Sequence, residues 1–162
     1  RAGGAPGAAG RRLMGRARVY DVGSHRVTIL LDAAATGGAI GLVEIAVPPG
    51  SGPLPHIHGR EDETYHVLEG EVVFTVDGAR HVVRAGGTAF GPRGIPHEFH
   101  NEGAETARLL VAVTPAGFEE YFAECGTPSA PDGPPAHPSP DLLMRLVGNA
   151  ARYGITFVPP AR

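Results

Sequence analysis

Apolar and polar residues alternate in short runs from Val19 to Val113, and glycine- or proline-containing turns separate the runs. Alternation with a period of two is typical of β-strands that bury one face. The runs cover residues 25–31, 40–47, 63–68, 71–76, 80–83, 88–91, 97–101 and 107–113. Asp77-Gly78, between two of these runs, is the preferred chemistry of a two-residue hairpin turn. Many short strands at this spacing predict an all-β antiparallel sandwich or barrel.

The pattern changes to a helical period after residue 115. Phe118, Tyr121 and Phe122 have the spacing of one helix face. A proline-rich connector follows, and Ser139-Pro140-Asp141 then has the form of a helix start, with serine as N-cap and proline at the first position. The apolar face of this second helix would consist of Leu142, Leu143, Leu146, Val147 and Ala150, with Gly154 as its stop. We expect this tail to pack on the outside of the barrel or to cover its mouth.

The two ends of the chain therefore differ from its middle. Residues 1–12 are rich in glycine and alanine without periodicity, which is typical of a flexible arm. The predicted organisation is an N-terminal arm over residues 1–18, a β-barrel over 19–115 and a helical C-terminal extension over 116–162.

Composition excludes several classes of partner. The chain has 162 residues and a formal net charge of −3, so its total charge does not suggest nucleic acid or an anionic membrane. It contains no apolar run long enough to span a bilayer. Cys125 is the single cysteine, which excludes an intramolecular disulfide and favours a reducing, cytoplasmic location.

A histidine pair and an acidic residue form the first candidate site. His56 and His58 are two residues apart, so on an extended backbone both imidazoles face the same way. Glu63 opens the next strand. Imidazole and carboxylate ligands suit one divalent transition metal: Fe, Ni, Mn, Co, Cu or Zn. The alternative is a pair of surface histidines beside a solvated acidic loop at residues 60–63.

A second stretch offers a third imidazole. Pro92 and Gly94 form a turn signal, and His97 begins the strand that follows. The two stretches resemble the two motifs of the cupin family, G(X)5HXH(X)3-4E(X)6G and G(X)5PXG(X)2H(X)3N. The first is matched by Gly50, His56, His58, Glu63 and Gly70, and the second by Gly86, Pro92, Gly94, His97 and Asn101.

The resemblance implies a small β-barrel of the jelly-roll type and a homodimer. It also implies that His56, His58, Glu63 and His97 bind one divalent transition metal per chain. Such a ligand set leaves coordination positions open for water, dioxygen or a chelating substrate.

Strand parity sorts the neighbouring candidates. If Glu63 points inward, Tyr65 shares its face and His66 points away. In the same way Phe99 shares the face of His97, and His100 points out. Tyr65 is either a substrate-orienting residue or a core side chain with its hydroxyl hydrogen-bonded. The remaining histidines, His25, His81 and His137, are expected at the surface or an interface.

Three phrases are similar to those of the small quercetinase-like cupins: residues 63–71, 92–97 and 114–119. This resemblance implies an oxygenase, similar to flavonol 2,4-dioxygenases, that acts on an aromatic or enolic small molecule chelating the metal. Glu63 would be both ligand and general base, and Tyr65 would belong to the pocket. Two alternatives stay open: a non-oxidative cyclase, isomerase or decarboxylase of a secondary-metabolite pathway, and a small-molecule-binding cupin without turnover.

Overall fold

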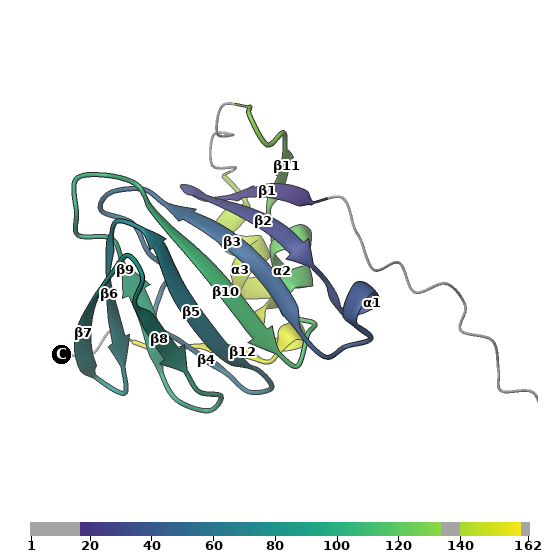
Figure 1. The fold of residues 1–162 in the computed structure, drawn as a ribbon. Coiled ribbons are helices and arrows are strands. Elements are labelled where there is room, and N and C mark those ends of the chain that lie inside the picture. The colour runs from purple at the N-terminus through teal and green to yellow at the C-terminus, as the bar shows by residue number, and fades with distance from the viewer. Residues whose placement is uncertain (1–16, 134–139, 160–162) are drawn as a thin grey trace, which may run out of the picture.

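The computed structural model describes residues 17–133 and 140–159, which fold into two antiparallel sheets (Figure 1). The first sheet contains β11 (Thr127–Ser129), β1 (Arg18–Val22), β2 (His25–Leu31), β3 (Gly41–Val47), β10 (Ala107–Thr114), β5 (Asp62–Glu69) and β8 (Thr88–Gly91), in that order. The second contains β12 (Ile155–Phe157), β4 (His56–His58), β9 (His97–His100), β6 (Glu71–Val76) and β7 (Ala79–Arg84). This architecture confirms the predicted all-β jelly-roll class.

The core lies between the sheets and is built by alternation. Every second residue of β3 and of β10 is buried. Val111 of β10 lies opposite Val43 on one side and Tyr65 of β5 on the other, so three inward side chains form one layer. Burying such apolar surface is the main force that holds the two sheets together.

The predicted hairpin turn between β6 and β7 is confirmed by its backbone. Asp77 and Gly78 have φ angles of 50° and 76°, and positive φ at both central residues is the requirement of a type I′ turn. The turn follows from the sequence because aspartate and glycine tolerate this conformation better than other residues.

Strand β2 is an interior strand of the first sheet and offers no edge to a second copy of the chain. In the structure β2 lies between β1 and β3, so both of its edges already have partners. The strands at the edges of the two sheets are instead β11, β8, β12 and β7.

Short helices follow β2 and β10. Helix α1 (Ala33–Thr36) begins after Asp32, whose side chain accepts a hydrogen bond from the Ala35 amide. The tail contains α2 (Glu119–Cys125), α3 (Leu142–Ala150) and a 3₁₀ turn, η1 (Ala151–Tyr153). Figure 1 shows α2 and α3 side by side behind the first sheet, where the Tyr121 hydroxyl donates to the Leu146 carbonyl at 2.8 Å. None of the described helices is long and apolar enough to cross a membrane.

The tail differs from the sequence expectation in two ways. It contains two strands, β11 and β12, and each adds to the edge of a sheet. Helix α3 begins at Leu142 with Asp141 as its N-cap residue, and no side chain caps it. Ser139, the expected cap, lies outside the described residues, as do His137 and residues 1–16 of the expected arm.

Candidate metal centre

The four candidate ligands meet between the two sheets. His56 and His58 come from β4, His97 from β9 and Glu63 from β5. One ligand atom from each lies within 4.8 Å of the others, and all four residues are buried. The structure thus brings together the four residues that were expected as metal ligands from the sequence. Because all four residues are buried, bulk water has little access to a metal bound between them.

Strand pairing sets the direction of the two β4 histidines. His56 pairs with His97 of β9, and on the other side of β4 the tail strand β12 places Phe157 opposite His56 and Ile155 opposite His58. Because side chains alternate, the two histidines face inward and Ile57 faces outward.

Two of the histidines are oriented by backbone carbonyls. The Nδ1 of His56 lies 2.7 Å from the Leu54 carbonyl, and the Nδ1 of His97 lies 2.9 Å from the Ile95 carbonyl. A carbonyl oxygen only accepts, so both Nδ1 atoms carry the hydrogen. The Nε2 atoms are then the ligand atoms, and that of His97 lies 3.0 Å from Glu63 Oε2.

The third histidine has no such carbonyl. The Nε2 of His58 lies 3.2 Å from Glu63 Oε2, and its Nδ1 faces Glu61 Oε2 at 3.5 Å. Burial lowers the pKa of His58, but the carboxylates of Glu63 and Glu61 outweigh burial and raise that pKa to about 9. Burial lowers the pKa of His56 to about 4.

Glu63 is ionised in this environment. Burial raises the pKa of its carboxyl group, but the neighbouring histidines, His58 foremost, bring the pKa well below its usual range. A carboxylate beside a protonated His58 is therefore the expected metal-free state at neutral pH. A metal that takes the Nε2 of His58 must displace that proton, so metal binding releases a proton.

Tyr65 lies on the inner face of β5, as parity predicts, and its hydroxyl donates to Glu63 Oε2 at 2.6 Å. Burial, with the Glu63 charge, raises the pKa of Tyr65 well above its usual range, so the side chain remains a neutral phenol. Its ring packs against Phe74 and Phe99, with centroids 5.0 and 5.8 Å away. The hydroxyl is thus a donor aimed at the candidate ligand.

A cavity of about 360 Å³ adjoins the cluster, and His56, Glu63 and Tyr65 form part of its wall. Much of the remaining wall is apolar, with Val27, Ile45, Phe99, Phe118, Leu146 and Ile155 among the lining residues. Residues of α2, α3 and β12 line it as well, so the tail closes one side of the cavity.

His25 is the site residue that sequence reasoning misplaced. It was expected at the surface or an interface, but it lines the cavity, with its ring centroid 6.2 Å from that of Phe99. Burial lowers the pKa of His25 to about 4, so the imidazole is neutral. The signal was present, because His25 is two residues before Val27 and shares its inward face.

The other described histidines, His66, His81 and His100, follow the sequence expectation. His66 is only half-buried on the outward face of β5, and His100 is exposed at the end of β9, so neither joins the cluster. His81 is exposed on β7.

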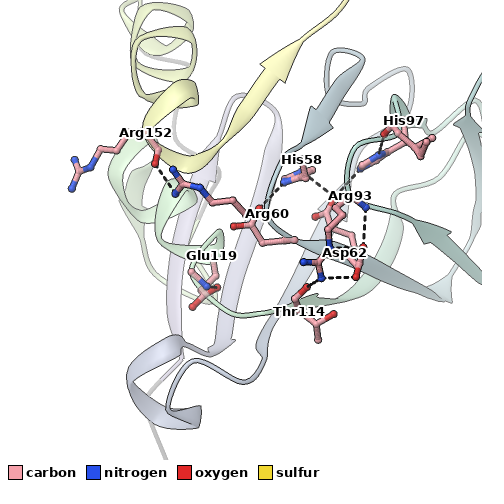
Figure 2. Close-up of polar contacts among 12 residues, drawn as sticks. His58, Arg60, Asp62, Arg93, His97, Thr114, Glu119 and Arg152 are labelled. Atoms are coloured by element: carbon pink, nitrogen blue, oxygen red, sulfur yellow. Dashed lines mark hydrogen bonds and ion pairs between the residues drawn. The ribbon is translucent and has the colours of Figure 1, made fainter.

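The acidic loop before Glu63 is anchored, which contradicts the alternative of a merely solvated loop (Figure 2). Asp62 accepts hydrogen bonds from the Arg93 backbone amide at 2.9 Å and from its guanidinium at 2.7 Å. The guanidinium of Arg60 donates to the Arg152 carbonyl at 2.9 Å. Glu61, between these two, is 5% exposed.

Residues 43–113 match the family model described as a cupin domain. The chain is 24% identical to quercetin 2,3-dioxygenase of Bacillus subtilis over 149 residues, which cover 91% of this chain and 44% of that protein. It is 27% identical to the polyketide synthase CurC of Streptomyces cyaneus over 129 residues, 78% of this chain and 82% of that protein.

Among solved structures, the chain is similar to a predicted oxalate decarboxylase from Thermotoga maritima. The TM-score is 0.53 with 27% sequence identity, over 60% of this chain and 90% of that one. The chain spans only about half the length of several curated relatives that it matches, 44% in the case of the dioxygenase. The activities of those longer proteins therefore cannot be assigned directly to this chain and are used below only as the basis of proposals.

Proposed function

The two-sheet domain of this chain is a cupin domain, and on that premise we propose that it is a metal-dependent enzyme. We propose one divalent transition metal per chain, held by His56, His58, Glu63 and His97. The observation that carries the proposal is the burial of these four residues with their ligand atoms within 4.8 Å of one another.

The donor set fits such an ion. Three imidazoles and one carboxylate are suited to the first-row divalent metals. The two ring nitrogens of the buried His58 make no hydrogen bond among the described residues, although the carboxylates of Glu63 and Glu61 lie 3.2 and 3.5 Å from them. When bound, the ion would supply Lewis acidity and open positions for dioxygen or a chelating oxygen.

The proposed reaction is a dioxygenation of an aromatic or enolic compound, similar to that of quercetinases. The cavity of about 360 Å³ falls within the usual size of small-molecule sites, and its apolar walls suit an aromatic body. Tyr65 and Glu63 are the polar groups that a hydroxyl of this compound would meet beside His56.

In this proposal Glu63 takes the proton of the bound hydroxyl, and Tyr65 holds the carboxylate in place through its 2.6 Å hydrogen bond. The base role requires neutral imidazoles around Glu63, because a protonated His58 holds the pKa of Glu63 too low for it to accept a proton.

A second candidate is a non-oxidative cyclase, isomerase or decarboxylase. It is favoured by the similarity to the polyketide synthase CurC, of which this chain covers 82%, against 44% for the dioxygenase. Oxygen consumption distinguishes the two candidates, because a cyclase converts its substrate without dioxygen.

Metal analysis tests the site first. We expect about one metal per chain in the wild type, strong depletion in His56→Ala and His97→Ala, and wild-type content in His81→Ala, whose histidine is exposed on β7. Equal metal content in all four proteins would refute the site.

Oxygen uptake with flavonols and other enolic aromatics then tests the reaction. Metal-loaded Glu63→Gln should bind such a substrate and turn it over roughly 10² to 10⁴ times more slowly, the usual cost of a lost general base. Wild-type turnover in that variant would leave Glu63 as a ligand alone.

A further inference from the structure

We propose that Glu61 is a positioning residue of the metal centre: its carboxylate accepts the Nδ1–H of His58 and fixes that ring with Nε2 toward the metal. The inference rests on the metal site proposed above, but it does not depend on which reaction the site performs.

The three histidines of the cluster are supported in different ways. His56 and His97 each donate their Nδ1–H to the carbonyl of the residue two positions earlier, Leu54 and Ile95, at 2.7 and 2.9 Å. For His58 the corresponding bond to the His56 carbonyl is not made, because its Nδ1 has no hydrogen-bond partner among the described residues. His58 therefore needs support from elsewhere in the chain.

Glu61 offers that support. Its Oε2 lies 3.5 Å from His58 Nδ1, and its side chain is 6% exposed against 0% for His58. Neither of these two buried atoms makes a hydrogen bond among the described residues, although they face each other. Two facing, buried and otherwise unpartnered atoms, one a donor and one an acceptor, form a natural pair.

Metal binding makes this pair obligatory. An imidazole that gives its Nε2 lone pair to a metal keeps its hydrogen on Nδ1, and a buried N–H requires an acceptor. A carboxylate in this place holds the ring orientation and makes the imidazole a stronger ligand. Among the three histidines, His58 is thus the one whose strength as a ligand depends on another side chain, whereas backbone carbonyls support His56 and His97.

The loop around Glu61 is held firmly enough for such a role. Gly59 donates its amide hydrogen to the Gly154 carbonyl at 2.8 Å, and Arg60 donates to the Arg152 carbonyl at 2.9 Å. On the other side Asp62 is paired with Arg93, as Figure 2 shows. Anchors on both sides leave Glu61 little freedom to turn away from His58.

The test is metal affinity, measured with Co²⁺ and Zn²⁺ by competition with a chromophoric chelator, without any substrate. We expect Glu61→Ala to bind both ions 10- to 100-fold more weakly than the wild type, the usual effect of losing such a partner. Glu61→Gln keeps an acceptor oxygen without the charge, so it should recover part of the affinity. The visible spectrum of bound Co²⁺ should change in Glu61→Ala, because the orientation of one ligand is lost.

Asp62→Asn is the matched control. It removes one negative charge from the same loop, but asparagine keeps the Oδ1 that accepts the Arg93 backbone amide at 2.9 Å, so the loop stays anchored. Asp62 pairs with Arg93 and not with His58. We expect this variant to keep the affinity and the Co²⁺ spectrum of the wild type. Equal losses in Asp62→Asn and Glu61→Ala would overturn the proposal, since the loop charge alone would then explain them. If Glu61→Ala fails to fold, the nearly isosteric Glu61→Gln takes its place in the test. Undiminished affinity of Glu61→Gln for Co²⁺ and Zn²⁺ also overturns the proposal.

The outcome is separable from that of the proposed function. A wild type that binds Co²⁺ but consumes no oxygen, with weakened binding in Glu61→Ala, supports Glu61 and refutes the oxygenase. An active wild type whose Glu61 variants keep full affinity supports the oxygenase and refutes the role of Glu61. A wild type that binds neither ion refutes both.

Discussion

Removing one hydroxyl from Tyr65 tests whether this residue belongs to the centre or only to the core. In Tyr65→Phe the ring remains between Phe74 and Phe99, and the hydrogen bond from the hydroxyl to Glu63 Oε2 is lost. Glu63 then keeps its histidine neighbours but loses its one phenolic donor. We expect the variant to fold, to be less stable and to bind metal more weakly.

The size of the effect follows from the contact. A buried hydrogen bond to a charged group contributes about 1.5–3 kcal/mol to stability. In a domain of this length each kcal/mol corresponds to about 2–4 °C in the melting temperature. The metal-free variant should therefore melt about 3–12 °C lower. Its metal affinity should fall about 10- to 100-fold, because the hydroxyl orients a ligand.

Tyr121→Phe is the matched control for the same chemical change. The Tyr121 hydroxyl also lies in the cavity region, but it donates to the Leu146 carbonyl at 2.8 Å and has no contact with the cluster. A bond to a neutral carbonyl contributes about 0.5–1.5 kcal/mol, so this variant should melt only slightly lower. Its metal affinity should equal that of the wild type.

The measurements are melting curves of the metal-free wild type, Tyr65→Phe and Tyr121→Phe, and Co²⁺ titrations of the same three proteins. If Tyr65→Phe keeps wild-type affinity and loses no more stability than Tyr121→Phe, the reasoning is refuted. Tyr65 would then be a core side chain with a satisfied hydroxyl, the alternative that the sequence left open.

Two further predictions concern His25 and the assembly. Because burial lowers the pKa of His25 to about 4 from 6.5, the unfolded chain takes up a proton there before the folded chain does, and stability falls as the pH drops from 6.5 to 4. In urea titrations, His25→Phe should reduce this pH-dependent fall in the free energy of unfolding by up to about 3 kcal/mol. Parallel pH profiles of stability for the wild type and the variant would contradict this prediction. We also expect light scattering to show a homodimer. Phe90 is 54% exposed on the edge strand β8, so Phe90→Glu should shift the measured mass toward that of the monomer. A monomeric wild type would count against this prediction.

The sequence was sufficient for the cluster because the resemblance to the two cupin motifs implied its four members. Parity gave the common direction of His56 and His58, and only the match to the second motif joined His97 to them. Inward direction follows from position within a strand, so the same reasoning set His66 and His100 aside correctly. His25 obeys the same rule through Val27, and attention to parity alone would have placed it.

Glu61 and Asp62 show where such reasoning stops. The two acids are adjacent in sequence, yet Glu61 is buried beside His58 and Asp62 is paired with Arg93 at the surface. Glu61 precedes the first residue of β5, so no alternation fixes the direction of its side chain. Its environment depends on the anchors at Arg93 and Arg152, which lie far away along the chain.

The tail strands could not be read from sequence for a related reason. Strands β11 and β12 have three residues each, too few to show a period, and each forms only because a distant strand offers an open edge. For β12 this edge belongs to β4, which pairs with β9 through one residue pair, His56 with His97. The three pairs between β12 and β4 are thus the larger part of the sheet contacts that hold both histidines in place. The residues farthest from the motifs therefore help to position the ligands that the motifs supply, and metal binding and docking of the tail should stabilise each other.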